Sequence, residues 1–138
     1  MTEPSLSVVI PSFNRGGLIG RALKSVLAEI NHADEIIVVD DGSTDHTAEI
    51  IEELSDRRIR YIRQSNAGAE AARNRGAAEA SNELLAYLDS DDEWLPGKTE
   101  AQRTFMAAHS TLLNVLKDRA QLKNGSGHHN GWLFRMRV

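Results

Sequence analysis

Two clusters of acidic residues stand directly after apolar runs that read as β-strands. Asp89-Ser90-Asp91-Asp92 follows the run 84–88, and Asp40-Asp41 follows the run 36–39. Carboxylate oxygens are the ligands that Mg²⁺ and Mn²⁺ take in proteins, often together with phosphate oxygens. A single acidic triplet is more often a polar turn with a helix-capping aspartate. Two such clusters at one edge of a sheet would repel each other unless a cation or hydrogen-bond donors lay there, and this favours a cation site.

Asp40 allows two interpretations. A carboxylate at the end of a strand can accept an N–H from a nucleobase or bind ribose hydroxyls. The segment 40–45, Asp-Asp-Gly-Ser-Thr-Asp, is equally good turn and helix-cap chemistry. The residues alone leave both interpretations open.

Basic residues gather between the two acidic clusters. Six arginines lie in a stretch whose only acid is Glu70, at positions 57, 58, 60, 63, 73 and 75. We assign Arg73 to a diphosphate, because it begins the second turn of a helix that follows Gly68. Arg57, Arg58 and Arg60 are expected on solvated faces. His128-His129 lies in a Gly/Ser-rich stretch and reads as part of a flexible tail rather than as a metal site.

The motifs of several other α/β proteins are missing. The chain has no G-x-G-x-x-G after its first strand, no G-x-x-x-x-G-K-[ST] and no G-x-S-x-G. These absences argue against a dinucleotide-dependent dehydrogenase, a P-loop NTPase and an esterase of the α/β type.

Strand and helix patterns alternate along the first hundred residues. Period-two or unbroken apolar runs predict strands over 6–10, 35–39, 59–63 and 84–88, with Pro11 ending the first. Helical spacing predicts helices over 18–30, after the turn at 41–45, over 68–80 and over 98–123. This order predicts an α/β fold with a mostly parallel sheet and helices on both faces.

The acidic clusters then meet at one edge. We expect the strand order 3-2-1-4, with the reversal between strands one and four. Ligands of doubly wound sheets bind at such a reversal, at the carboxyl ends of the strands. The segments 11–14, 40–43 and 89–92 would open on that crevice.

Composition and charge limit the remaining choices. The chain has 138 residues, 41% of them hydrophobic and 26% charged, and it has no cysteine. No apolar run is long enough to span a bilayer and no signal peptide is evident, so we expect a soluble, cytoplasmic domain. Residues 1–100 hold ten basic and nineteen acidic residues, which argues against nucleic acid as a partner. Residues 101–138 hold six basic residues and one acidic, which leaves weak contact with an anionic membrane open.

Taken together, four segments resemble the family 2 inverting glycosyltransferases, which have the GT-A fold, a Rossmann-like sheet. They are 7–15, 35–45, 66–76 and 88–92, with the sequences SVVIPSFNR, EIIVVDDGSTD, NAGAEAARNRG and LDSDD. Each segment alone is a weak signal. All four occur in the order and spacing of the family, so together they are specific.

The resemblance implies a nucleotide-sugar donor, most often a UDP-sugar, bound with Mg²⁺ or Mn²⁺. By matching positions it assigns Asp40 to the uracil and Asp91 to the metal. The metal would neutralise the leaving diphosphate as a Lewis acid. The other nucleotide-binding positions that it implies are Pro11, Phe13 and Asn14 around the base and ribose, Gly68 and Arg73 along the nucleotide-sugar, and Asp89 with Ser90 near the ribose or sugar.

The resemblance covers the donor-binding half of such an enzyme. Family members continue into an acceptor site with a catalytic Asp or Glu that deprotonates the acceptor hydroxyl. After Glu100 the only acidic residue is Asp118, so no catalytic residue is assigned. We divide the chain into a nucleotide-sugar-binding domain over 1–123 and a linker with a basic aromatic tail over 124–138. Without further strands the edge beside strand four would be exposed, which predicts a homodimer through the helix 98–123 and the tail around Trp132 and Phe134.

Two other functions remain open. A non-catalytic module would bind UDP or UDP-sugar without transferring the sugar. A response-regulator-like phosphoacceptor domain would also hold Mg²⁺ at strand ends. It requires an acidic pair after strand one, however, whereas here the pair follows strand two.

Overall fold

The computed structural model describes residues 4–108, 116–118 and 131–135. The linker expected at 124–130, with His128 and His129, lies outside these residues. In chain order the elements are β1 (Leu6–Ser12), α1 (Ile19–Leu27), β2 (Glu35–Asp40), α2 (Thr47–Leu54), β3 (Ile59–Arg63), α3 (Ala69–Glu79), β4 (Leu84–Tyr87), α4 (Lys98–Ala108), β5 (Leu116–Asp118) and β6 (Gly131–Arg135).

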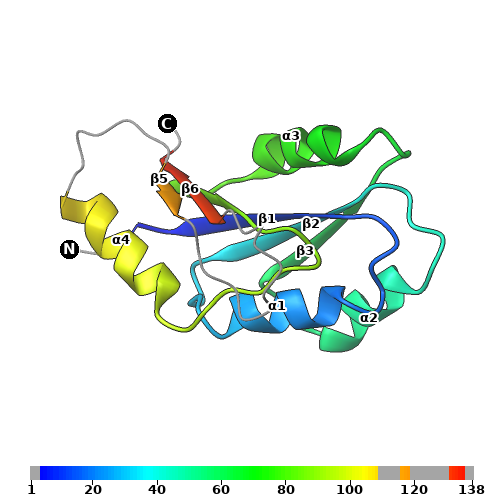
Figure 1. Ribbon diagram of the computed structural model, residues 1–138, viewed down its shortest axis with the longest axis horizontal. Coiled ribbons are helices and arrows are strands. Elements are labelled where there is room, and N and C mark those ends of the chain that lie inside the picture. The colour runs from blue at the N-terminus through cyan, green and yellow to red at the C-terminus, as the bar shows by residue number, and fades with distance from the viewer. Residues whose placement is uncertain (1–3, 109–115, 119–130, 136–138) are drawn as a thin grey trace.

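The strands form one mixed sheet in the order β3-β2-β1-β4-β6-β5. The first four strands are parallel, whereas β6 runs antiparallel to β4 and β5 antiparallel to β6. The predicted order 3-2-1-4 is confirmed. In Figure 1, α3 covers one face of the sheet, and α1 and α2 cover the other. The alternation of strands and helices in the sequence thus gives the α/β architecture that it predicts.

β1 lies at the centre and is buried along its whole length. Val8 and Ile10 pack into the core on the side of α1, and Val9 packs into the core on the side of α3. Because both faces of the strand are covered, its apolar run is unbroken rather than alternating.

β1 extends two residues further than predicted, through Pro11 to Ser12. Val9 and Ser12 show why proline is tolerated there. The Val9 carbonyl accepts a bond from the Leu88 N–H on the β4 side, and the Ser12 carbonyl accepts one from the Asp41 N–H on the β2 side. Strand alternation therefore turns the Pro11 nitrogen to the β4 side, beyond the last β1–β4 pair at Val9. No ladder hydrogen bond is lost there.

The C-terminal prediction needs correction. The helix predicted over 98–123 ends at Ala108 as α4, and Leu116–Asp118 is the strand β5. Within the expected tail, Gly131–Arg135 forms β6 and pairs with Leu84–Tyr87 of β4. Local helical spacing does not register the free hydrogen-bonding edge of β4, which only the folded sheet presents. The edge expected to remain exposed is therefore occupied by β6, and the argument from that edge for a homodimer is wrong.

Two carboxylates near the amino edge of the sheet fix α4. The buried Asp34 accepts the N–H groups of Leu6 and Asn31, at 2.8 and 2.9 Å, and pairs with the buried Arg103 of α4. Glu29 accepts the N–H groups of Gly97 and Thr99 at the start of α4. A carboxylate at a helix N-terminus satisfies amide groups that the helix leaves unbonded and complements its dipole. These contacts anchor the end of the β4–α4 loop that leads into α4.

Among the described residues, no helix has the length and apolarity that crossing a membrane requires.

Gly76 lets α3 approach β1 closely, and this contact is testable. A Cβ atom at Gly76 would lie 2.2 Å from Cγ1 of Val9, a β-branched residue with no exposed surface. We expect Gly76→Ala to lower the free energy of unfolding in urea by about 1–3 kcal/mol, because neither partner can move aside. Gly20→Ala, also in a helix, is the control, since its nearest contact would be an ordinary 3.4 Å to Ile50. Equal stability of the two variants would contradict the close packing of α3.

Candidate functional site

A cavity of about 640 Å³ opens at the carboxyl edge of the sheet. The loops that follow β1, β2 and β4 reach it, together with the start of α3. Eight of the nine residues predicted for the site line it, and Asp40 does not. The lining residues are Pro11, Ser12, Phe13, Asn14, Arg15, Asp41, Asn66, Gly68, Ala69, Ala72, Arg73, Asp89, Ser90 and Asp91.

Asp40 is where the structure differs from the predicted site. Its side chain has no exposed surface and does not line the cavity. It accepts hydrogen bonds from the Ser43 N–H at 2.8 Å and from the Tyr61 hydroxyl, and it pairs with Arg63 at 3.4 Å. Burial and the hydrogen bond to Asp40 raise the pKa of Tyr61, so the phenol stays protonated and donating. A contact from Asp40 to a base would require the carboxylate to leave these partners.

Asp41 lines the cavity instead. Strand alternation explains the exchange, because consecutive residues face opposite sides of a sheet. The Asp41 carboxylate accepts the Gln64 amide at 2.8 Å and the N–H groups of Ala67 and Gly68 at 2.8 and 2.9 Å. Burial acts to raise the pKa of Asp41, but these three hydrogen bonds outweigh it and hold the pKa below the ordinary 3.8. Asp41 therefore fixes the loop that leads into α3 as a buried anion.

Asn14 braces the neighbouring loop. It adopts a left-handed conformation, with φ of 51°, which asparagine tolerates better than most residues. Its side-chain oxygen accepts the Thr44 N–H at 2.8 Å, and its own N–H donates to the Ser43 hydroxyl at 2.9 Å. Two residues later the Gly16 N–H donates to Asp45 at 2.9 Å. These bonds join the loop after β1 to the loop after β2, so the wall that carries Phe13 is held in place.

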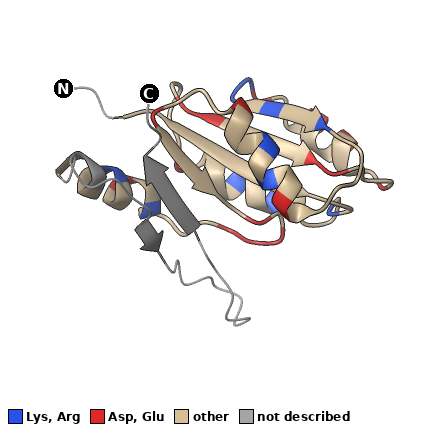
Figure 2. Ribbon diagram, turned by 90° about the horizontal axis from the view of Figure 1, so that it is seen from above, with Lys and Arg blue, Asp and Glu red and all other residues tan. Residues whose placement is uncertain are grey.

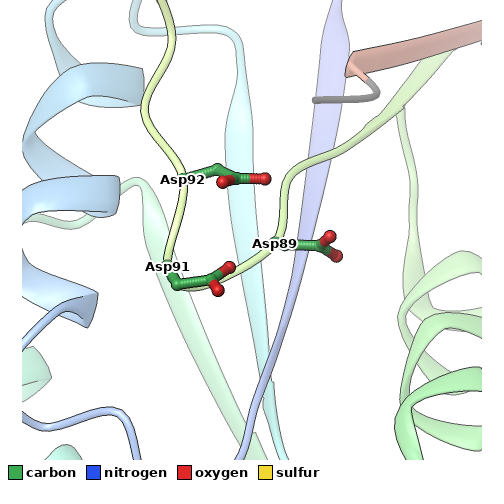
Figure 3. A group of neighbouring side chains, drawn as sticks. All are labelled: Asp89, Asp91 and Asp92. Atoms are coloured by element: carbon green, nitrogen blue, oxygen red, sulfur yellow. The ribbon is translucent and has the colours of Figure 1, made fainter. Parts of the chain in front are cut away.

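Three carboxylates gather on the loop after β4 (Figure 3). Oxygens of Asp89, Asp91 and Asp92 lie within 4.8 Å of one another. A cation of the size of Mg²⁺ or Ca²⁺ holds oxygens at about 2.0–2.6 Å, so its opposing ligands lie about 4–5 Å apart. The donor set and spacing therefore fit a divalent cation. The sequence places Asp92 in the same acidic cluster, but the resemblance assigned the metal to Asp91 alone.

Arg73 is the one member of the arginine group at the cavity. Its guanidinium pairs with Asp89 at 2.9 Å, and both side chains remain partly exposed. Arg60 and Arg75 instead pair with Glu79, and Arg58 pairs with Asp56. Figure 2, with basic residues blue and acidic residues red, shows the two signs interspersed over the described elements.

The architecture is of the GT-A type. Its parallel strands have the order 3-2-1-4, and a cavity and an acidic loop lie at their carboxyl edge. The comparisons with known proteins agree. The family model described as glycosyl transferase family 2 matches residues 7–135, so the chain belongs to this family.

Among its relatives is an uncharacterized glycosyltransferase of Rickettsia conorii, 37% identical over 115 residues, which cover 83% of this chain and 19% of the relative. A GalNAc(5)-diNAcBac-PP-undecaprenol beta-1,3-glucosyltransferase of Campylobacter jejuni is 41% identical over 98 residues, or 68% of this chain and 32% of the relative. The chain therefore spans about a fifth of the length of the first relative and about a third of the second.

Solved structures show the same fold. S. aureus TarS 1-349 matches with a TM-score of 0.82 at 24% identity, over 95% of this chain and 47% of that one. The TarS 1-349 complex with UDP-GlcNAc matches with a TM-score of 0.79 at 28% identity, over 90% of this chain and 36% of that one.

The buried anion at Asp41 gives a pH-dependent prediction. We expect Asp41→Asn to lower the free energy of unfolding at pH 7 by about 1–3 kcal/mol, because an amide turns an N–H toward donors. A carboxylate whose pKa is lower in the folded than in the unfolded state stabilises the fold. This stabilisation is fully present above the unfolded-state pKa and is lost as the pH falls through the folded-state pKa. The stability difference between the unsubstituted chain and the variant should thus shrink from about pH 5 to pH 3 in urea denaturation. For Glu52→Gln, on the exposed side of α2, we expect a small, constant difference. A difference for Asp41→Asn that stays constant would contradict the anionic role.

Proposed function

We propose that this chain binds a nucleotide-sugar, in the first instance a UDP-sugar, together with Mn²⁺ or Mg²⁺. The observation that carries the proposal is the group of Asp89, Asp91 and Asp92 at the rim of a cavity large enough for a nucleotide. The 28% identical TarS structure in complex with UDP-GlcNAc supports a UDP-sugar as the ligand.

Each wall of the cavity suits one part of such a ligand. Phe13 is 45% exposed at the cavity and offers a ring face to a base. Asp41 holds the loop at Gly68 beside it and takes the place proposed from the sequence for Asp40. Arg73 also lines the cavity, next to Asp89, where its guanidinium suits a diphosphate. When bound, the cation supplies Lewis-acid stabilisation of the diphosphate leaving group.

Transfer of the sugar also needs a base for the acceptor hydroxyl. Among the described residues, the carboxylates lining the cavity are Asp41, Asp89 and Asp91. Asp41 is bonded to three donors, and we assign the other two to the cation. This favours two candidates, a donor-binding part of a glycosyltransferase and a non-catalytic UDP-sugar module. The phosphoacceptor alternative does not agree with the family.

The first test is a calorimetric titration of UDP with and without Mn²⁺. We expect binding that depends on Mn²⁺ and that Asp91→Asn weakens at least about tenfold, or about 1.4 kcal/mol. Glu52→Gln removes an equal charge from α2 and should bind UDP normally. Absence of UDP binding in both conditions would contradict the proposal. Binding of UDP-sugar without hydrolysis or transfer, even with acceptor, would favour the non-catalytic module.

The role of Arg73 can be separated from that of the residues around the nucleobase. We expect Arg73→Gln to weaken the binding of UDP at least about fivefold and to leave the affinity for uridine nearly unchanged, because only UDP carries the phosphates that a guanidinium pairs with. Arg75→Gln is the matched control, two residues further along α3 and bonded to Glu79. Equal losses for UDP and uridine in competition titrations would contradict this role.

Two further predictions about the chain in solution are still to be tested. We expect a homodimer through α4, the described part of the predicted helix 98–123, and a cytoplasmic location. A monomeric mass by light scattering at tens of micromolar would contradict the homodimer.

A further inference from the structure

The acidic loop after β4 is tied to α1, which covers the opposite face of the sheet from α3, the helix that carries Arg73. Nη2 of Arg21 donates to the backbone carbonyl of Asp91 at 2.8 Å. Nε of the same guanidinium lies 3.4 Å from the Glu93 carboxylate. One arginine therefore bridges the backbone and a side chain of the segment that carries the candidate cation ligands.

A second contact lies one helical turn further on. The Ser25 hydroxyl accepts the Trp94 N–H at 3.0 Å. Residues 21 and 25 share one face of a helix, so α1 holds the loop at two points along a single line. α1 is itself anchored by Ala22 and Val26, which are fully buried in the core. The loop thus rests on a rigid element.

The two arginines near the loop make different contacts. Arg73 pairs with the carboxylate of Asp89, an oxygen that a cation would need. Arg21 uses a backbone carbonyl of Asp91 and leaves the carboxylate of that residue to the cation. The Glu93 carboxylate beside Arg21 also offsets its positive charge. Arg21 can therefore hold the loop in shape without occupying a ligand.

We propose that Arg21 is a positioning residue for the divalent-cation site: it holds the backbone of the Asp89–Glu93 loop so that its carboxylates converge before the cation binds. This inference rests on the proposed cation site. Groups that orient metal ligands without touching the metal commonly change metal affinity by about 10- to 100-fold when they are removed.

The sign of the effect separates positioning from simple charge. A guanidinium near a cation repels it, so removal of the charge alone would leave Mn²⁺ affinity unchanged or raise it. Loss of a positioning contact would instead lower the affinity for Mn²⁺. We expect Arg21→Ala to weaken Mn²⁺ binding by about tenfold, the lower end of the usual range, because Arg21 is partly exposed. Mn²⁺ binding is measured on the full chain by calorimetry and by the electron paramagnetic resonance of free Mn²⁺.

Lys24→Ala is the matched control. Lys24 is exposed on the same helix, one turn from Arg21, and its removal deletes the same charge. We expect a change of less than about twofold, since exposed charges are screened at ordinary salt. The affinity for uridine, which carries no diphosphate, and the melting temperature without metal should remain unchanged in both variants, which shows that the cavity and fold are intact.

Arg21→Lys tests the hydrogen bond itself. Lysine retains a charged donor for the Asp91 carbonyl but cannot bridge to Glu93 with planar geometry, so we expect Mn²⁺ affinity between those of the unsubstituted chain and Arg21→Ala. If Arg21→Ala binds Mn²⁺ as tightly as the unsubstituted chain or more tightly, or if Arg21→Lys is no better than Arg21→Ala, the positioning role is overturned and the proposed function stands. If the unsubstituted chain does not bind Mn²⁺, the cation site and the role of Arg21 are overturned together.

Discussion

The parallel pairing of β1 with both β2 and β4 is the constraint on which the rest of the structure depends. Ser12 pairs with Asp40 on one side, and Val9 pairs with Tyr87 on the other. Because parallel strands all leave the sheet at the same edge, this register brings three loops together that are far apart in the sequence. The close approach of α3 at Gly76 then sets the start of that helix beside the same edge. The cavity follows from backbone hydrogen bonds and packing, before any ligand is considered.

The charges at this edge are balanced in different ways. Three N–H donors compensate Asp41, and a guanidinium compensates Asp89. Asp91 and Asp92 add two further carboxylates within 4.8 Å of Asp89. Like charges held so close raise the free energy of the loop, and a bound divalent cation would lower it. The loop can keep this arrangement because α1 bonds it at Asp91 and Trp94, and Glu29 bonds it at Gly97, next to the start of α4.

The comparison of Asp40 with Asp41 shows how far sequence reasoning reached in the site. An acidic pair after a strand predicts that one carboxylate faces the crevice, and the resemblance assigned that place to Asp40. In the structure Asp40 contacts Tyr61 and Arg63, whereas Asp41 lines the cavity. The choice depends on which face of β2 α3 covers, and this is a property of the packed layers. Cavity lining by the other eight predicted residues follows from their position at strand ends or at the start of α3.

The amino-acid sequence by itself determined the four parallel strands, their order and the family, because apolar periodicity and motif order are local signals that survive without tertiary context. Only the tertiary structure decided where the C-terminal helix and strands begin and end and which groups the charged side chains contact. Residues 116–118 have a helical pattern but form a strand, because a hydrogen-bonded sheet edge outweighs a weak local propensity. The contact of Arg21 with Asp91 joins residues 70 positions apart, and no spacing in the sequence indicates it, since long side chains choose partners only after the backbone has placed them.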